Sequence, residues 1–200
     1  MKFVEILNLP DPVDEIKQRS FQLIDRWQHN QRFTDNLKKF VLKDRNTNVA
    51  SAAQVFDDRL TKLIQEQYQS FFSFPVESAL SFFRNIGTTP ACLPPHTHPS
   101  RTVAMQYYFE VGGNVQTVLY DFVPNYNPSR FLDYFDYSDV KYNSHIVFEK
   151  EKWVMFNTRT PHSVENIERL RAFISFTFDP AYTVQSVLQD SKLEYKIVVE

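Results

Sequence analysis

The sequence predicts an α+β protein in which helices of the first third support a β-sandwich or barrel. Apolar residues recur every three or four positions up to about residue 71, and short apolar runs separated by turn residues follow Phe72. The 200 residues include 19 Phe and 10 Tyr but only three Gly, and aromatic residues favour sheets. This length predicts one domain, 1–200, with a helical layer over about 1–72 and a β-rich core over about 73–200.

Two helices are predicted in the N-terminal layer. Asp11-Pro12 is a helix-start signal, and the first helix is expected to run from there to about His29. The second is expected over about 50–71, where apolar residues again fall at three- and four-residue intervals.

Short strands are predicted throughout the remainder. Gly112-Gly113-Asn114 indicates a hairpin between the second and third of them. In the second strand, the odd-numbered residues should share one face and the even-numbered residues the other. The expected strands are 77–86, 101–111, 115–123, 144–148, 153–157, 162–166 and 169–178, with a final edge strand at 192–199.

The segment 124–143 differs from its surroundings, because six aromatic residues are interspersed with Asn, Asp, Ser and Pro. Long loops in compact domains often form lids or binding loops. A lid over a site and a set of aromatics packed on the barrel wall both remain open.

Composition argues against several classes of protein. The formal net charge of −2 offers no general attraction to nucleic acid or to an anionic membrane. The single cysteine, Cys92, excludes an internal disulfide and is expected to be a small buried hydrophobe, with a reactive thiolate as the alternative. No signal peptide is evident and no apolar run approaches the ~20 residues needed to span a bilayer, so a cytoplasmic protein is expected.

The histidines give the first indication of chemistry. His96 and His98 flank one residue in a proline-bracketed, extended segment, so their side chains point the same way. A β-rich domain could bring His162 to the same place, and three imidazoles on one face leave metal positions open for substrate. The other two histidines, His29 and His145, are expected to be structural.

Arg171 gives the second indication. It lies within the predicted strand 169–178, on the face opposite Ala172 and Ile174. A buried guanidinium without an anion is costly, and a carboxylate ligand would supply a two-bond partner. The alternatives are a strand end in solvent or an ion pair with an acid of this chain, namely Glu165, Glu168 or Asp179.

Together these residues resemble the iron(II)- and 2-oxoglutarate-dependent oxygenases, whose pattern is H-x-D/E, a distal His, and an Arg or Lys about ten residues further on. The strings at 95–101 and 156–166 are most similar to the aspartyl/asparaginyl β-hydroxylase-like branch. The resemblance covers about 76–179. It implies a double-stranded β-helix core, which is a cupin-like jelly roll, with supporting N-terminal helices.

The resemblance also implies an activity and its residues. A small-molecule or peptide substrate would be hydroxylated while 2-oxoglutarate is converted to succinate and carbon dioxide. His96 and His162 would bind iron(II) and Arg171 would bind the distal carboxylate of 2-oxoglutarate, which makes these three the catalytic set. Further expected contributors are His98 on the metal, Arg101 on a carboxylate of cosubstrate or substrate, Ser163 or Ser175 on the cosubstrate, and Arg169 as a replacement for Arg171.

This chain departs from the family at position 98, where His98 replaces the acidic ligand. A neutral imidazole leaves the site about one charge unit more positive, and Glu110 or Asp121 on nearby predicted strands could supply the missing carboxylate. Two other functions stay open. One is a cupin-type three-histidine dioxygenase that does not use 2-oxoglutarate, and the other is a non-catalytic jelly-roll binding or structural protein. The sequence does not predict the oligomeric state.

Overall fold

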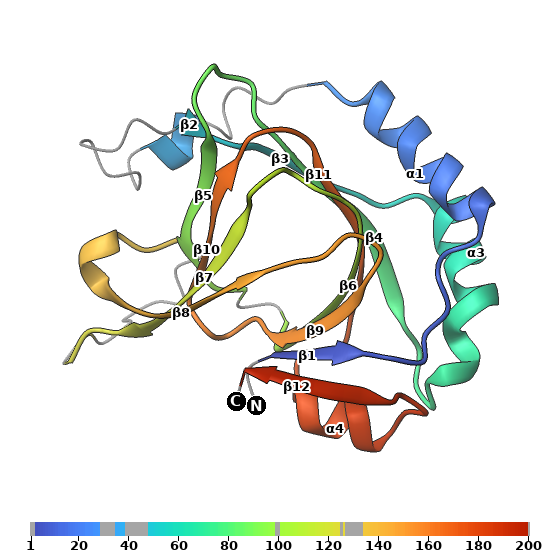
Figure 1. The fold of residues 1–200 in the computed structure, drawn as a ribbon. Coiled ribbons are helices and arrows are strands. Elements are labelled where there is room, and N and C mark those ends of the chain that lie inside the picture. The colour runs from blue at the N-terminus through green and yellow to red at the C-terminus, as the bar shows by residue number, and fades with distance from the viewer. Residues whose placement is uncertain are drawn as a thin grey trace.

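The computed structural model describes residues 3–28, 35–38, 48–98, 101–124, 126 and 134–199. Two β-sheets face each other and make the double-stranded β-helix expected from the sequence (Figure 1). The larger sheet consists, in order, of β12 (Tyr195–Val199), β1 (Phe3–Ile6), β9 (Trp153–Asn157), β6 (Val103–Val111), β11 (Arg171–Thr177), β4 (Glu77–Arg84) and β3 (Ser51–Val55). The smaller consists of β2 (Asn48–Val49), β5 (Ala91–His96), β10 (His162–Ile167), β7 (Gln116–Phe122) and β8 (Val140–Val147).

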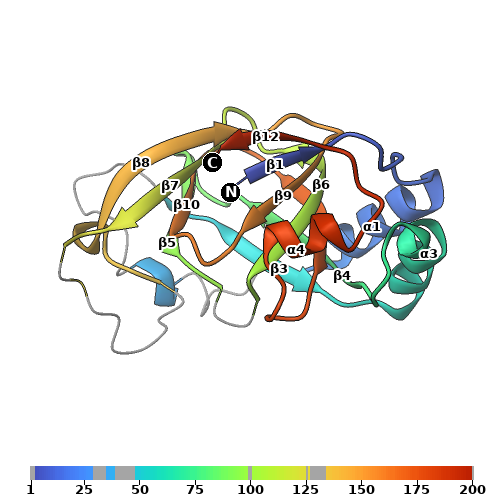
Figure 2. The same cartoon turned by 90° about the horizontal axis from the view of Figure 1, so that it is seen from below.

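The helices cover the outer face of the larger sheet. They are α1 (Asp14–Arg26), α3 (Asp58–Tyr68) and α4 (Val184–Gln189), with the 3-10 turn η2 (Gln69–Phe71) after α3. A second 3-10 turn, η3 (Tyr137–Asp139), lies beside the smaller sheet, just before β8. Figure 2 shows α1, α3 and α4 on the side away from β5, β7, β8 and β10. No helix among the described residues is both long and apolar enough to cross a bilayer.

Side-chain alternation in β6 and β11 divides the core into two layers, as the sequence predicts. The odd-numbered residues of β6 from Val103 to Phe109 and the even-numbered residues of β11 pack against the helices, whereas Ala104, Tyr108 and Phe173 face the smaller sheet. The layer between the sheets is rich in aromatic rings, and the functional cavity described below lies within it.

The N-terminal third is less helical than predicted. β1, β2 and β3 all lie in it, and the helix expected over 50–71 is only the 11 residues of α3. Asp57 sets the start of α3, because its side chain accepts a hydrogen bond from the Leu60 amide at 2.9 Å. The residues before it pair with β4, so the three-residue spacing of apolar side chains around Ala52 was not a helical signal.

The segment 124–143 is only partly a loop. The end of it forms η3 and the first half of β8, and β8 begins four residues earlier than predicted. Residues 125 and 127–133, which belong to the expected lid, lie outside the described residues, as does His29.

Candidate metal and oxoacid site

His96 and His162 are direct cross-strand partners, because the ladder between β5 and β10 pairs them. Their ring centroids lie 4.3 Å apart, and both residues are buried. His98 follows the end of β5, where its amide donates to the Thr158 carbonyl at 3.1 Å. Its ring centroid lies 5.1 Å from that of His96 and 5.4 Å from that of His162.

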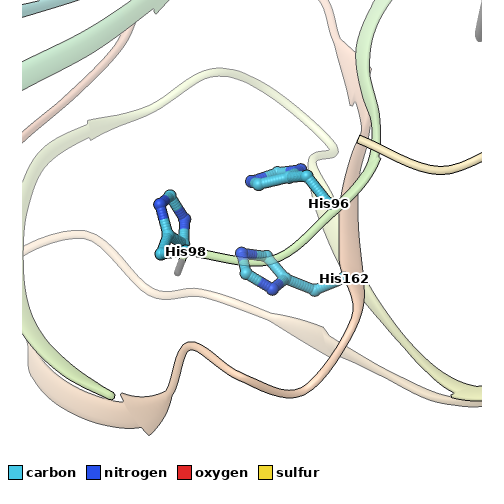
Figure 3. Close-up of side chains that lie close together, drawn as sticks. All are labelled: His96, His98 and His162. Atoms are coloured by element: carbon cyan, nitrogen blue, oxygen red, sulfur yellow. The ribbon is translucent and has the colours of Figure 1, made fainter. Parts of the chain in front are cut away.

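The three imidazoles converge on one point (Figure 3). One nitrogen from each ring can be chosen so that all three lie within 4.8 Å of one another. Nitrogens that share a metal at bonds of about 2.1 Å are about 3.0–3.4 Å apart, so modest ring rotations would complete a three-histidine centre. Among the described residues, no Asp, Glu or Cys belongs to this cluster.

Hydrogen bonds fix the rings of His96 and His162 in the tautomer that a metal requires. The Nδ1 of His96 lies 2.8 Å from the Pro94 carbonyl oxygen, and the Nδ1 of His162 lies 2.8 Å from that of Thr160. A carbonyl can only accept, so each Nδ1 carries the proton and each Nε2 keeps its lone pair for a metal. This is the outer-shell arrangement that metal-binding histidines usually have.

Burial also keeps the histidines neutral. It lowers the pKa of His96 to about 4 and holds the pKa of His98 and His162 well below the ordinary value, with the nearby Arg101 guanidinium acting in the same direction. The imidazoles are therefore unprotonated at neutral pH. A donor set of three neutral nitrogens fits a divalent transition metal.

Arg171 points into the space between the sheets and is only 2% exposed. Its Cζ lies 4.9–6.0 Å from the ring centroids of Tyr108, Phe148, Phe83 and Phe173. Its Nη2 donates to the hydroxyl of Tyr108 at 2.8 Å and to Thr117 at 3.3 Å. The Nε and Nη1 atoms are buried and have no hydrogen-bond partner.

The ion pairs considered for Arg171 are not formed. No described carboxylate lies within salt-bridge distance of it, and the Glu165 carboxylate instead accepts from Ser163 and Tyr137. A buried cation with two idle donors is costly unless an anion reaches it. The idle Nε and Nη1 lie on different edges of the guanidinium, so either of them can donate a charge-assisted hydrogen bond to an anion that enters the cavity.

A cavity of about 250 Å³ connects the two halves of the site. His96, His98 and Arg101 contribute to its lining, and Arg171 contributes with Tyr108 and Thr117. Most of the remaining lining is apolar or aromatic, and Gln54, Ser81 and Gln106 add polar groups; the apolar and aromatic residues are Ala52, Ala53, Phe83, Leu93, Tyr134, Phe148, Phe156, Val164 and Phe173. Because the cavity holds two arginines and no carboxylate among its described residues, it suits an anionic ligand.

Arg101 lines this cavity beside His98. Its Nη2 is 3.4 Å from the Nδ1 of His98, and burial lowers its pKa to about 10, so it remains charged at neutral pH. A guanidinium can only donate, so this contact favours the tautomer of His98 whose Nε2 carries the proton. Of the three histidines, His98 is thus the one whose present hydrogen bond competes with metal binding.

Other candidate residues lie elsewhere. The hydroxyl of Ser163 is 2.9 Å from that of Tyr120 and is outside the cavity. Ser175 is buried without a hydrogen-bond partner but does not line the cavity, and Arg169 is exposed in the turn before β11. Neither acid proposed to replace the missing ligand does so, since Glu110 pairs with Lys150 at 2.8 Å and Asp121 accepts from Asn143 at 2.7 Å.

The last two residues with assigned structural roles agree with expectation. Cys92 is buried and is not part of a disulfide. His145 lies on β8 with its Nδ1 3.0 Å from the hydroxyl of Tyr142, and it does not belong to the metal cluster.

Sequence reasoning missed the residues that hold Arg171. Tyr108 and Thr117 contact it from β6 and β7, and Phe148 stacks over it from just beyond β8. The predicted alternation put Tyr108 on the same strand face as Ala104, but nothing in the sequence related these three distant positions to one another. Tyr134 belongs to the aromatic segment 124–143, for which a lid and packing on the barrel wall were both open, and its ring centroid lies 5.4 Å from that of His96.

No known family profile matches the sequence, and no curated protein matches it. Among solved structures, the chain is similar to the non-heme alpha ketoglutarate dependent epimerase SnoN from nogalamycin biosynthesis, with a TM-score of 0.51 and 11% identity over 90% of this chain and 79% of the other. A prolyl hydroxylase from Trichoplax adhaerens gives a TM-score of 0.49 and 14% identity, over 95% and 87% of the two chains. Bacillus subtilis oxalate decarboxylase gives 0.36 and 14%, and this chain spans only 28% of its length. At these identities the likeness to SnoN shows a shared fold.

Proposed function

We propose that this protein is an iron(II)- and 2-oxoglutarate-dependent oxygenase that hydroxylates an amino-acid, peptide or protein substrate. The observation that carries this proposal is the buried Arg171 guanidinium, whose Nε and Nη1 have no partner and which lines the same cavity as His96 and His98, two of the three converging histidines. A ligand that binds at both ends of the cavity needs a carboxylate for Arg171 and a second group that can coordinate a metal held by the histidines. A 2-oxo dicarboxylic acid has both.

Each part of the site has a role in this proposal. His96 and His162 present their Nε2 lone pairs because backbone carbonyls hold their Nδ1 protons. Arg171 orients the distal carboxylate, and the aromatic rings around it exclude water from that end of the cavity. Iron(II) bound to the histidines would supply the activation of dioxygen that is coupled to decarboxylation of the oxoacid.

The strings at 95–101 and 156–166 support the finer assignment to the aspartyl/asparaginyl β-hydroxylase-like branch. The three neutral histidines support one other function, a cupin-type dioxygenase that does not use 2-oxoglutarate. That function gives Arg171 no ligand, because a neutral or monoanionic substrate held at the metal would leave Nε and Nη1 idle.

Binding measurements on the purified protein test the proposal. We expect stoichiometric iron(II) binding, saturable 2-oxoglutarate binding in the metal-loaded protein, and slow succinate release without any other substrate. His162→Ala should lose stoichiometric metal, whereas His145→Ala, which changes a histidine outside the cluster, should retain it. Stoichiometric iron in His162→Ala would overturn the metal site, and tight iron with no 2-oxoglutarate binding would favour the cupin-type function.

A further inference from the structure

A second hollow lies beside the metal site. This outer groove has a volume of about 950 Å³ and shares Gln54, His98 and Arg101 with the inner cavity. Arg171 lines the inner cavity but is absent from the described lining of the outer groove. Because His98 borders both hollows, a ligand in the outer groove would lie next to the metal position while the pocket of Arg171 stays available to the oxoacid.

The outer groove is built on the end of the larger sheet. Thr177 at the end of β11 is paired with Glu77 of β4 and with Ala104 of β6. Glu77, Thr177 and Asp179 all line the groove. Along β6, Ala104 is two residues from Gln106 of the inner cavity, which is about 7 Å. The acidic part of the groove therefore begins within the length of a small molecule from the inner cavity.

Arg101 supplies a positive charge at the junction of the two hollows. The contact that its guanidinium makes is the one to the Nδ1 of His98 at 3.4 Å, and no described carboxylate lies within salt-bridge distance of it. A partly buried guanidinium without an acidic partner favours a ligand that carries an anionic group. Since Arg101 adjoins His98, this group would lie close to the metal position.

Two carboxylates face the same groove and are not neutralised by Arg101. Glu77 and Asp179 are exposed, and neither forms an ion pair with any described residue. The segments that carry Arg101 and Asp179 run side by side, because the hydroxyl of Thr102 donates to the Pro180 carbonyl at 2.8 Å. Opposite charges on neighbouring segments thus border one groove without pairing with each other. A ligand with both an anionic and a cationic group would complement this arrangement.

Building on the proposed function, we propose that the prime substrate is a free amino carboxylic acid whose carboxylate binds Arg101 and whose ammonium group binds Asp179 and Glu77. These two contacts would hold its carbon skeleton beside His98. The remaining volume of the groove, with the ring of Phe56 that is 72% exposed on its lining, has room for an apolar side chain. A residue within a polypeptide has neither charge on its backbone and could use neither contact.

The first test offers the common amino acids to the iron-loaded protein with 2-oxoglutarate, both free and as N-acetyl amides, which represent residues within a chain. We expect at least one free amino acid to raise succinate release above the substrate-free rate and to gain one oxygen atom per succinate. Its N-acetyl amide should have a kcat/KM at least about tenfold lower, because it has lost both charges. Blocked forms that work as well as the free ones would overturn the inference.

Forms of the best amino acid that are blocked at one end separate the two charges. Its amide keeps the ammonium group and loses the carboxylate, whereas its N-acetyl form keeps the carboxylate and loses the ammonium group. We expect each change to lower kcat/KM by about threefold to tenfold, the range for losing one partly or fully exposed charge pair. Full activity of either form would remove the corresponding contact from the proposal.

Conservative variants assign each charge to its partner. Arg101→Gln should make the amide as good a substrate as the acid, while the preference for a free ammonium group remains. Asp179→Asn with Glu77→Gln should have the reverse effect, and a general loss of folding or of metal would not separate the two preferences in this way. Arg169→Gln and Glu168→Gln change exposed residues just before the opposite end of β11, and both should leave both preferences unchanged.

The same variants test a different role for Arg101. If its guanidinium binds 2-oxoglutarate instead, Arg101→Gln should raise the KM for 2-oxoglutarate and leave the ratio of acid to amide as it is in the wild type. That result would overturn the assignment of Arg101 to the substrate. An altered ratio together with an altered KM would still support the substrate contact, because the ratio does not depend on the cosubstrate.

The two levels of the proposal fail differently. If the wild-type protein binds iron and 2-oxoglutarate and releases succinate alone, but no free amino acid stimulates it, the proposed function stands and the substrate class is wrong. If the protein binds neither metal nor 2-oxoglutarate, the proposed function itself is wrong. Saturation-transfer NMR with the same amino acids and variants then still measures binding to the groove, and absence of binding would overturn the groove assignment as well.

Discussion

Arg171 is surrounded by four aromatic rings, and two hydroxyl oxygens occupy only one of its three nitrogens. Its burial therefore costs free energy that the folded protein does not recover without a ligand. Such an arrangement is typical of a residue retained for binding, because an apolar side chain of similar length would pack equally well.

In Arg171→Met we expect the unfolding temperature and the affinity for 2-oxoglutarate to respond differently. Because the variant removes an uncompensated buried charge, its metal-free form should unfold at a temperature equal to or above that of the wild type. Its affinity for 2-oxoglutarate should fall by about tenfold to a hundredfold, which is the range for losing a charge-assisted pair of hydrogen bonds.

Thermal unfolding and 2-oxoglutarate titration of the same sample check both sides. Arg169→Met, at the exposed arginine two residues earlier, should change neither quantity. A large loss of stability in Arg171→Met with normal oxoacid binding would make the guanidinium a structural element instead.

His98 is the residue at which this site departs from the acid that the resembling family uses. In His98→Asp, a carboxylate would face both the metal position and Arg101, whose guanidinium now lies 3.4 Å from the imidazole. We expect tighter iron(II) binding and faster succinate release without substrate, because the carboxylate adds a negative charge beside the metal. Iron titration measures this, His145→Asp is the control, and weaker binding in His98→Asp would show that the third imidazole is the better ligand.

Residue-level predictability follows from local geometry. The H-x-H spacing requires both side chains to point the same way on an extended chain, so His96 and His98 could be paired from the sequence. The same alternation turns Ser163 to the face of β10 opposite His162 and Val164, so its hydroxyl lies beside Tyr120 and not in the cavity.

At the level of elements, the boundary between β3 and α3 shows why the N-terminal third was misjudged. Asp57 ends the extended chain and caps the helix, and its carboxylate also binds Arg19 of α1, whose Nε lies 3.0 Å from Oδ1. The Arg19 guanidinium accordingly holds the pKa of Asp57 below its usual value. One residue thus positions α3 against both the sheet and α1.

Replacing this cap should be measurable. Asp57→Ala should lower the free energy of unfolding by about 1 kcal/mol through the lost cap alone. Asp58→Ala removes an acid from the first turn of the same helix without removing the cap, so its effect should be smaller. Urea unfolding of both variants checks the difference, and equal effects would mean that the cap contributes little.

The inner strands could be read from the sequence because both of their faces are constrained. β6 and β11, of nine and seven residues, are paired on both edges and alternate between two apolar layers, so their patterns are long and regular. β1, β2 and β3 contain two to five residues each, and α4 has six, which is too short for a periodicity to be recognised. Their structure depends on neighbours distant in the sequence.

For the whole molecule, burial of three neutral histidines between the sheets links stability to pH. An exposed histidine in the unfolded chain has a pKa near 6.5, whereas burial lowers that of His96 to about 4. Between these values the unfolded chain binds protons that the folded protein excludes. The metal-free protein should therefore lose stability as the pH falls from about 6.5 towards 4.

Urea unfolding of metal-free protein at pH 7.5, 6.0 and 5.0 tests this dependence, above the range in which most carboxylates titrate. The expected decrease is a few kcal/mol at most, and His96→Asn should reduce it. A flat profile over this range would mean that the histidines take up protons in the folded state.

The pairing of His96 with His162 has a mechanical consequence for the smaller sheet. β5 and β10 are held by a ladder with two irregularities in register, and Pro94 and Pro95 lack amide donors, so few backbone hydrogen bonds join them. A metal shared by the two histidines would act as a cross-link between segments distant along the chain, reducing the entropy of any state in which the strands separate. Without metal, the amides of β5 and β10 should exchange well before those of β6 and β11, and loading with metal should close most of that gap.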